Sequence, residues 1–434
     1  MRLTILHTND IHGHQERLAQ IATLVQREKA SSLHTVLYLD GGDVEETTNP
    51  LSNVTKGTAM HRLLGCASCD AATVGNACWL RYGAGVLADH ARAAPYPLLL
   101  ANLAPVAGPV PSALFGDVGV FGLTDPFREI FEDVDWGFEP LDELEVARAT
   151  SADLRRRGAR LVVLLSHLGL EKPEGRWDDR RIAEELQDDV DLIVGAHSHD
   201  LLPEGEWVGR VLITQAGAFG EHLGRIEIDD GSISASVAPV DGDVQRSLLV
   251  EEEAARIVAE VEELLADELG SVDAELDAGW IAGALRRRMG TEVGLFSEGL
   301  TAGVLPPGRV TRRALYEVSE TGANPAATTM TGAQLAEVIE RGNDPAFIEE
   351  TPRSHRGRRR GHLHMRGVTR EELVADRAYT VAGTDWELAP YGGYVLADWN
   401  LEVRFDFPTI VREAIEEELT GQRVDVELDA CGDG

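Results

Sequence analysis

Carboxylate and histidine side chains follow the ends of several apolar runs in this sequence. The run at residues 3–6 leads into Asp10 and His12, and the run at residues 36–39 leads into Asp43. Later runs lead in the same way into four further candidates, namely Asn76, His167, His197 and His199. Imidazole nitrogens, carboxylates and amide oxygens are ligands for hard or borderline divalent cations. The set predicts a metal centre, although any one of these histidines alone would more often be a hydrogen-bonded structural residue.

The size of the set indicates two ions. Its seven ligands exceed what one tetrahedral ion takes, so we expect two ions that share one carboxylate. Because the set has no thiolate, Mn, Zn, Fe, Co and Ni are all acceptable. Two adjacent cations lower the pKa of a bridging water and hold the attacking and leaving oxygens of a phosphoryl displacement. The chemistry predicted is metal-assisted hydrolysis of a phosphoester.

A layered α/β domain is needed to position these residues. Apolar strand-like runs alternate with helical spacing from residue 1 to about 240, as at Leu18, Ile21 and Val25. Further strands are expected at residues 72–74, 98–100, 118–121, 211–213 and 225–228. In an open α/β sheet, ligands bind at the carboxyl ends of the parallel strands. The candidate ligands are therefore expected to converge at one edge.

The remainder of the chain divides into a connector and a second domain. We expect a domain at 1–240, a connecting helix within 241–272, and a smaller α/β domain at 273–434. Apolar residues between Val250 and Leu269 have the spacing of an amphipathic helix. This helix could equally belong to a single domain. Thr331 and Gln334 have the spacing of a capping box at the start of a later helix.

The charge of the chain is strongly negative, at -34 over 434 residues, and only three lysines are present. Carboxylates hold hydration water, and concentrated salt screens their repulsion, so we interpret the excess as adaptation to a salty cytoplasm. The alternative is an acidic surface that recruits a basic partner. The charge argues against a duplex nucleic acid as partner.

No stretch approaches the roughly 20 apolar residues that span a bilayer. The first strand begins too early for a signal peptide, so we expect an intracellular protein.

Two smaller motifs allow alternatives. Cys66 and Cys69 form a Cys-x-x-Cys pair without the second pair of a structural zinc site, so all four cysteines, with Cys78 and Cys431, are expected to be reduced and mostly buried. Five arginines gather at residues 353–360. They could grip a phosphate, but a solvated loop paired with nearby carboxylates is favoured.

Together the motifs resemble a known family. The segments at residues 10–12, 40–43, 75–76, 166–167 and 195–199 are similar to the blocks of calcineurin-like metallophosphoesterases. The opening His7-Thr8-Asn9-Asp10 and the C-terminal segments at 305–311, 330–335 and 379–394 resemble the 5'-nucleotidase and UDP-sugar hydrolase branch. The resemblance covers nearly the whole chain. It implies a four-layer sandwich of two β-sheets flanked by helices, plus a smaller α/β substrate-binding domain.

The resemblance also implies roles for single residues. Asp10, His12 and His199 would bind one metal ion, and Asp43 would bridge it to the other. The second ion would be bound by Asn76, His167 and His197. A nucleotide would contact the C-terminal domain through Trp386, Asn324 and Tyr394, although Trp386 could equally be a core residue.

The sequence departs from the family at the reacting centre. Ala77 and Leu80 stand where the family has a His and an Asp that orient the substrate and assist the transition state. General acid–base help is typically worth about 10²- to 10⁴-fold, so monoester cleavage would be slower. In the C-terminal domain, Ala302 replaces an Arg that faces the phosphate. The catalytic side chains are therefore left unassigned.

The leading hypothesis is a cytoplasmic, dinuclear-metal 5'-nucleotidase-like phosphatase of nucleotide catabolism. A phosphodiesterase or pyrophosphatase is a serious rival, because some phosphodiesterases of this superfamily also lack the His. A metal- and nucleotide-binding regulatory protein with little turnover is the rival from another class. The sequence gives neither the base and sugar of the substrate nor the oligomeric state.

Overall fold

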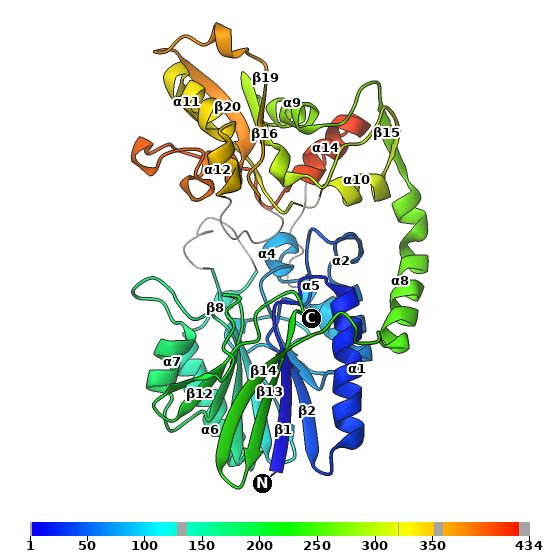
Figure 1. Cartoon of the computed structure of the whole chain (residues 1–434). Coiled ribbons are helices and arrows are strands. Elements are labelled where there is room, and N and C mark those ends of the chain that lie inside the picture. The colour runs from blue at the N-terminus through cyan, green and yellow to red at the C-terminus, as the bar shows by residue number, and fades with distance from the viewer. Residues whose placement is uncertain (1, 128–136, 320, 351–358, 425–434) are drawn as a thin grey trace. The chain divides into compact units, whose positions relative to one another are not determined.

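A computed structural model of the chain describes residues 2–127, 137–319, 321–350 and 359–424. The chain divides into two compact units (Figure 1). The first consists mainly of Met1–Thr47 and Leu51–Glu260, and the second of Thr48–Pro50 and Val261–Glu427. None of the helices in these described ranges combines the length and the apolar character needed to cross a bilayer.

Two six-stranded sheets form the centre of the first unit. One has the order β14-β13-β1-β2-β3-β4, in which β1 to β4 are parallel. The other has the order β11-β12-β10-β9-β7-β6, in which β7, β9, β10 and β12 are parallel. The strands of the first sheet are β1 Arg2–Thr8, β2 Thr35–Asp40, β3 Ala71–Thr73, β4 Leu98–Leu99, β13 His222–Asp229 and β14 Ser232–Pro239. Those of the second are β6 Ser112–Phe115, β7 Val118–Thr124, β9 Leu161–His167, β10 Leu192–Gly195, β11 Glu206–Val208 and β12 Val211–Thr214.

Strand β9 shows why both faces of the second sheet must be covered. Leu161, Val163 and Leu165 belong to a buried cluster shared with the first sheet. The alternate residues Val162 and Leu164 belong to a cluster on the other face, shared with helices α6 Glu143–Arg156 and α7 Asp179–Glu185. Because successive side chains of a strand point to opposite faces, a continuous apolar run requires cover on both sides.

Helices complete the four layers of the first unit. Helix α1 Gln15–Ser31 runs along the first sheet, and α6 and α7 lie on the second (Figure 1). The other helices and a small strand pair are α2 Pro50–Val54, α3 Thr58–Cys66, α4 Trp79–Tyr82, α5 Val86–Ala93, β5 Leu103–Ala104 and β8 Glu139–Pro140. The predicted four-layer α/β sandwich is confirmed.

The second unit is a smaller α/β structure, as predicted. Its five-stranded sheet has the order β19-β16-β20-β18-β21, with only β16 and β20 parallel. These strands are β16 Val293–Ser297, β18 Pro325–Thr331, β19 Leu363–Arg366, β20 Ala378–Thr384 and β21 Arg404–Phe405, and a separate pair is β15 Glu268–Val272 with β17 Gly308–Thr311. The helices are α9 Ala278–Met289, α10 Arg312–Val318, α11 Gly332–Gly342, α12 Pro345–Glu349, α13 Asp385–Leu388 and α14 Val411–Thr420.

Several local predictions can be compared directly with these elements. The expected capping box is present: Thr331 Oγ1 accepts the Gln334 N–H at 3.2 Å, and Gln334 Oε1 accepts the Thr331 N–H at 2.9 Å. The expected connector helix is α8 Leu248–Ala266, and the division between the units falls inside it. The sequence-based domain limits themselves stay a prediction. Cys69 and Cys78 are buried, Cys66 is partly buried, and all three are in the reduced form, whereas Cys431 lies outside the described residues.

Candidate metal centre

Each of the seven predicted ligands lies at or just past the carboxyl end of a parallel strand. Asp10 and His12 follow β1, Asp43 follows β2, and Asn76 follows β3. His167 is the last residue of β9, and the pair that follows β10 is His197 and His199. Backbone bonds join the first two loops, from the Asp10 N–H to the Gly42 carbonyl and from the His12 N–H to the Asp43 carbonyl, each at 2.9 Å. The fold therefore brings five strand ends from two sheets to one place.

Five of these ligands have a left-handed backbone. The φ angles are 51° at Asp10, 47° at His12, 54° at Asp43, 72° at His197 and 59° at His199. Only eleven non-glycine residues in the described part of the chain have positive φ. Such residues are uncommon and cluster at functional sites, where the surrounding structure holds them in place. This backbone geometry is independent support for a built site.

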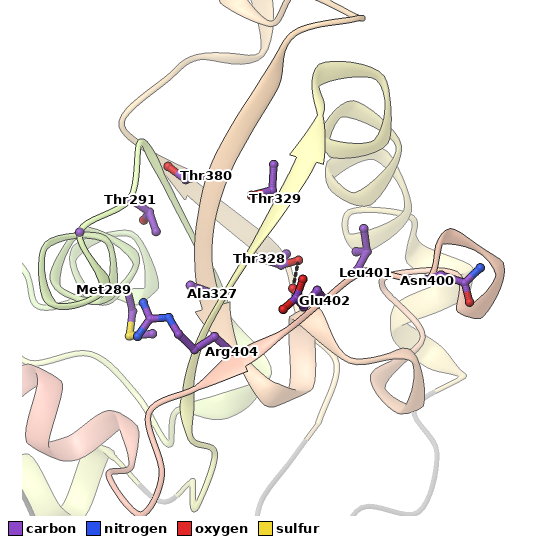
Figure 2. A pocket seen from close by; sticks show the side chains of 11 residues that line it. Met289, Thr291, Ala327, Thr328, Thr329, Thr380, Asn400, Leu401, Glu402 and Arg404 are labelled. Atoms are coloured by element: carbon purple, nitrogen blue, oxygen red, sulfur yellow. Dashed lines mark hydrogen bonds between the residues drawn. The ribbon is translucent and has the colours of Figure 1, made fainter.

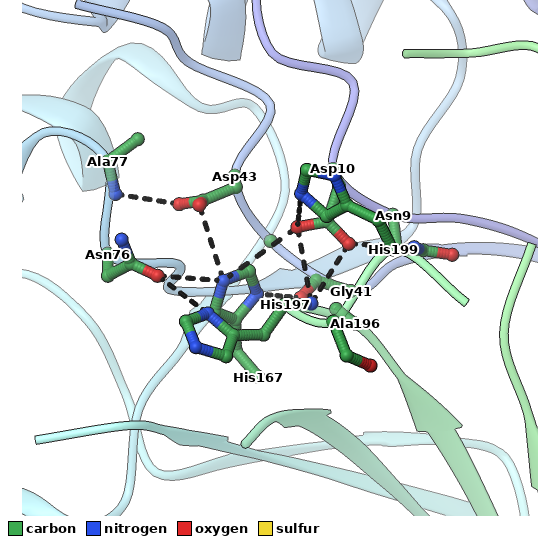
Figure 3. Close-up of polar contacts among 12 residues, drawn as sticks. Asn9, Asp10, Gly41, Asp43, Asn76, Ala77, His167, Ala196, His197 and His199 are labelled. Atoms are coloured by element: carbon green, nitrogen blue, oxygen red, sulfur yellow. Dashed lines mark hydrogen bonds and ion pairs between the residues drawn. The ribbon is translucent and has the colours of Figure 1, made fainter. Parts of the chain in front are cut away.

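One group of donor atoms consists of Asp10, His12 and His199. The Nε2 atoms of the two histidines are 3.1 Å apart. Asp10 Oδ1 lies 3.8 Å from His12 Nε2 and 3.5 Å from His199 Nε2. The other oxygen, Oδ2, accepts the His197 N–H at 2.9 Å and the Asn9 side-chain amide at 2.8 Å (Figure 3). One carboxylate oxygen is thus fixed by hydrogen bonds while the other faces the imidazoles.

A second group consists of Asn76, His167 and His197. The amide oxygen of Asn76 lies 3.2 Å from His167 Nε2 and 2.9 Å from His197 Nδ1 (Figure 3). The two rings stand edge to face, with centroids 5.1 Å apart. These are the three residues that the family resemblance assigns to the second ion.

Asp43 faces both groups. Its Oδ2 lies 3.3 Å from His167 Nε2 and 3.9 Å from His12 Nε2. Its Oδ1 accepts the backbone N–H of Ala77 at 2.7 Å (Figure 3). Asp10 also reaches across, since its Oδ1 is 3.9 Å from His167 Nε2. Gly75 leaves the room that Asp43 needs, because a Cβ there would lie 2.1 Å from Asp43 Oδ1.

Polar groups lie behind three of the imidazoles, and one of them accepts a hydrogen bond from His167. His167 Nδ1 donates to the Gly41 carbonyl at 2.8 Å, which leaves Nε2 for a ligand role. Glu46 Oε2 lies 3.3 Å from His12 Nδ1, and Asp125 Oδ2 lies 3.8 Å from His197 Nε2. Carboxylates and carbonyls behind metal-binding histidines fix the tautomer and raise the basicity of the ligand. The donor set and its outer partners fit a divalent ion that takes nitrogen and oxygen ligands.

Protonation in the absence of a cation follows the same charges. Burial raises the pKa of Asp10, but the hydrogen bond and charge of His199 and the charges of His167 and His12 outweigh it and lower the pKa to about 2. Burial lowers the pKa of His167, but Asp43 outweighs it and raises the pKa to about 9. Burial and the neighbouring His167 lower the pKa of His197 to about 3. The imidazoles therefore divide into a proton-holding member, His167, and a neutral member, His197, around the ionised Asp10.

The predicted substrate residues lie in the second unit. Trp386 is 5% exposed and donates from Nε1 to the Arg359 carbonyl at 3.1 Å. Tyr394 is fully buried and donates to Ser297 Oγ at 2.9 Å, and Asn324 donates to the Thr409 carbonyl at 2.6 Å. Neither aromatic ring is presented for stacking in this structure, and the nucleotide role of the three residues stays a prediction.

A pocket of about 520 Å³ in the second unit is lined by none of these three residues (Figure 2). Thr328 and Thr329 of β18 and Thr380 of β20 contribute to its wall.

Most of the arginine run at residues 353–360 lies outside the described residues. Arg360 is described, and its guanidinium donates to the carbonyls of Gly392, Phe347 and Glu350. In this structure Arg360 is therefore used in loop hydrogen bonds.

The sequence analysis missed several residues beside the centre. Asp125 follows β7 directly, and its carboxylate accepts from Lys172 Nζ at 2.5 Å and from Arg176 at 2.6 Å. Strand β7 was expected to end at residue 121 but runs to Thr124, so Asp125 was not recognised as a strand-end residue. Glu46 gave no signal, because nothing in its spacing connects it with His12.

Comparisons with known proteins match two families along the chain. The model for the calcineurin-like phosphoesterase family matches residues 3–201, and the model for the 5'-nucleotidase C-terminal domain matches residues 276–397. An uncharacterized metallophosphoesterase, YunD of Bacillus subtilis, is 28% identical over 370 residues, which are 78% of this chain and 77% of that protein. A snake venom 5'-nucleotidase of Naja atra is 26% identical over 62% of this chain, which spans only 59% of the venom enzyme.

Solved structures share the fold. A 5'-nucleotidase precursor from Thermus thermophilus superposes with a TM-score of 0.62 at 20% identity, covering 100% of both chains. A putative 5'-nucleotidase from Staphylococcus aureus superposes with a TM-score of 0.66 at 17% identity, covering 99% of this chain and 100% of that one. At these identities the superpositions support the fold.

The first prediction concerns metal retention. Asp43→Asn removes the charge that faces both ligand groups, and we expect the affinity for Mn²⁺ or Zn²⁺ to fall by at least about 100-fold, more than the loss of an outer partner causes. Bound metal is measured by mass spectrometry of the dialysed protein. The matched control is Asp243→Asn, at an exposed loop position. Equal metal content in both variants would contradict the assignment of Asp43.

Proposed function

We propose that this chain, a metal-dependent phosphoester hydrolase of the 5'-nucleotidase family, uses two divalent ions to remove phosphate from a nucleotide or a nucleotide-like ester. The observation that best supports the two-ion proposal is the position of Asp43 Oδ2, 3.3 Å from His167 and 3.9 Å from His12. The nucleotide substrate is supported by the match to the 5'-nucleotidase C-terminal domain and by relatives named 5'-nucleotidases.

The residues of the chain would divide the work as follows. Asp10, His12 and His199 would hold one ion, Asn76, His167 and His197 the other, and Asp43 both. When bound, such a pair supplies a water of lowered pKa and stabilises the charge on the phosphate oxygens. Glu46, Asp125 and the Gly41 carbonyl would keep the imidazoles in the required tautomers.

At position 77 this chain lacks the acid–base side chain that its family has there. The Ala77 side chain cannot transfer a proton, but its backbone N–H still holds Asp43. Lys172 and Arg176 place two cations on Asp125, next to His197. A cationic group near the centre favours a phosphate with several charges, although it does not replace a proton donor to the leaving oxygen. We therefore expect slow cleavage of esters with a poor leaving group.

A specific observation also supports a second candidate, a phosphodiesterase or pyrophosphatase. Both Ala77 and Leu80 are buried, at 1% and 7% exposed, and neither carries a titratable group. Diesters and pyrophosphates with better leaving groups need less protonation of the leaving oxygen. A low-turnover nucleotide-binding protein is the remaining alternative.

One panel of substrates tests the proposal. The purified chain in molar KCl with Mn²⁺ or Co²⁺ receives a nucleoside monophosphate, a cyclic nucleotide, an activated diester and a UDP-sugar. We expect phosphate release from the monophosphate with the highest kcat/KM. Preference for diesters or the UDP-sugar would favour the second candidate. Metal and nucleotide binding without turnover of any member would favour the binding protein.

A gain-of-function variant tests the role of position 77. Ala77→His, alone and with Leu80→Asp, returns a proton donor beside Asp43, and we expect monoester kcat to rise at least about 10-fold, below the full range for general acid catalysis. Ala77→Gln is the matched control, because it adds volume without a titratable group. An equal rate in the His and Gln variants would place position 77 away from the reacting atoms.

We propose in addition that the acidic surface adapts the protein to concentrated salt. Part of the negative charge lies on α8, where Glu252 and Glu263 are exposed. Like charges close together destabilise the compact state, and salt screens them within a Debye length of about 3 Å at 1 M. A cytoplasmic location stays a prediction.

The salt proposal predicts a rise in Tm with KCl. We expect Tm to increase by several degrees between 0.1 and 2 M KCl. Differential scanning calorimetry measures this increase. Replacing both Glu252 and Glu263 with Gln should reduce this increase, because fewer charges remain to be screened. A Tm that is flat or falls with KCl would exclude salt adaptation.

A further inference from the structure

Three buried residues next to the metal centre form a separate cluster that the proposed function does not use. Glu45 lies in the loop after β2, His61 lies in helix α3, and His90 lies in helix α5. They are 4%, 2% and 0% exposed. The His61 and His90 rings are 4.6 Å apart between centroids. A carboxylate and two imidazoles from three elements thus meet in the interior.

The distances in the cluster match those around a small cation. Glu45 Oε1 lies 3.4 Å from His61 Nε2 and 3.5 Å from His90 Nδ1. All three donor atoms lie within 4.8 Å of one another. A tetrahedral ion with bonds of about 2.0–2.2 Å sets neighbouring donor atoms about 3.3–3.6 Å apart. Both separations from the carboxylate fall in that interval.

The outer hydrogen bonds of the two rings leave one nitrogen of each, His61 Nε2 and His90 Nδ1, facing the carboxylate. His90 Nε2 lies 2.6 Å from the Lys56 carbonyl, which only accepts, so Nε2 carries the proton and neutral His90 presents a lone pair at Nδ1. His61 Nδ1 bonds Tyr96 Oη at 2.9 Å. Within the described residues, neither His61 Nε2 nor His90 Nδ1 has a hydrogen-bond partner. The buried acceptors His90 Nδ1 and Glu45 Oε1, 3.5 Å apart, face each other unfavourably unless a cation or a proton lies between them.

We propose that Glu45, His61 and His90 bind a third divalent cation, of the class of Zn²⁺, at a site distinct from the dinuclear centre. Two imidazoles and one carboxylate form a known zinc ligand set, with water in the fourth position. Tyr96 and the Lys56 carbonyl are the outer partners that orient such histidines.

The third ion has a structural role. Glu45 and Glu46 are adjacent but face different sites, since Glu46 lies 3.3 Å from His12 Nδ1. A cation on Glu45 ties the loop that carries Asp43 to helices α3 and α5. Because the loop is held on both sides, the position of Asp43 is fixed before substrate binds.

Metal counting on the full chain tests this site independently of activity. The protein is stripped with a chelator, loaded with Zn²⁺, and dialysed in molar KCl to remove surface ions. Mass spectrometry then gives the number of ions per chain. We expect three ions for the wild type and two for His90→Gln, whereas His34→Gln, at an exposed histidine, keeps three. Equal stoichiometry in the wild type and His90→Gln would overturn the proposal, whatever the fate of the dinuclear centre.

A second measurement decides the question even if His90→Gln fails to fold. In Asp43→Asn, whose dinuclear centre is impaired, Zn²⁺ should still raise Tm, because an ion that binds only the folded state stabilises it. Tyr96→Phe keeps all three donors but removes the outer partner of His61, so the affinity of the third ion should fall about 10- to 100-fold. No Zn²⁺-dependent rise of Tm in Asp43→Asn, or an unchanged affinity in Tyr96→Phe, would argue that a proton holds the cluster.

Discussion

The structure depends on the cost of burying carboxylates in the interior of the first unit. Asp10 and Asp43 are 0% and 3% exposed, and an ionised carboxylate without compensation costs several kcal/mol in such a position. The imidazoles of His12, His167 and His199 lie against these two carboxylates, and the backbone N–H groups of His197 and Ala77 donate to them. The contrast is Asp179, which bonds Ser166 Oγ but has no such group of imidazoles around it, and whose pKa is raised by burial to about 8. The same residue type is kept ionised in one place and neutral in the other, so the location of the histidines determines where a cation can bind.

Much of this arrangement could be predicted from the sequence because it follows one rule. Parallel strands end at one edge, so ligand-type residues placed directly after apolar runs must converge there. The rule failed at Asp125 only because β7 was expected to end three residues before it does. It could not find Glu45, His61 and His90, since two of these lie within helices and no spacing links them. Nor could it decide whether Trp386 and Tyr394 contact a ligand, because a core aromatic and an exposed one have the same sequence signal.

The departures from the family pattern affect the two functions of the site unequally. Ala77 keeps the backbone N–H that holds Asp43 Oδ1, and this bond does not require a side chain. The His of the family can therefore be lost without disturbing the ligand geometry. In the proposed site, metal binding and proton transfer to the leaving group therefore depend on different groups.

The left-handed backbone has a consequence for substitutions at Asp10, His12, Asp43, His197 and His199. Asp and His enter this conformation more readily than most residue types, so one residue can both form the turn and offer the proposed donor atom. Exchanging such a residue for a β-branched or bulky one would disturb the turn together with the proposed ligand. Substitutions at these five positions are therefore expected to affect the backbone turn and the proposed site together, whereas substitutions at positions 77 and 80 change neither a positive-φ turn nor a proposed ligand.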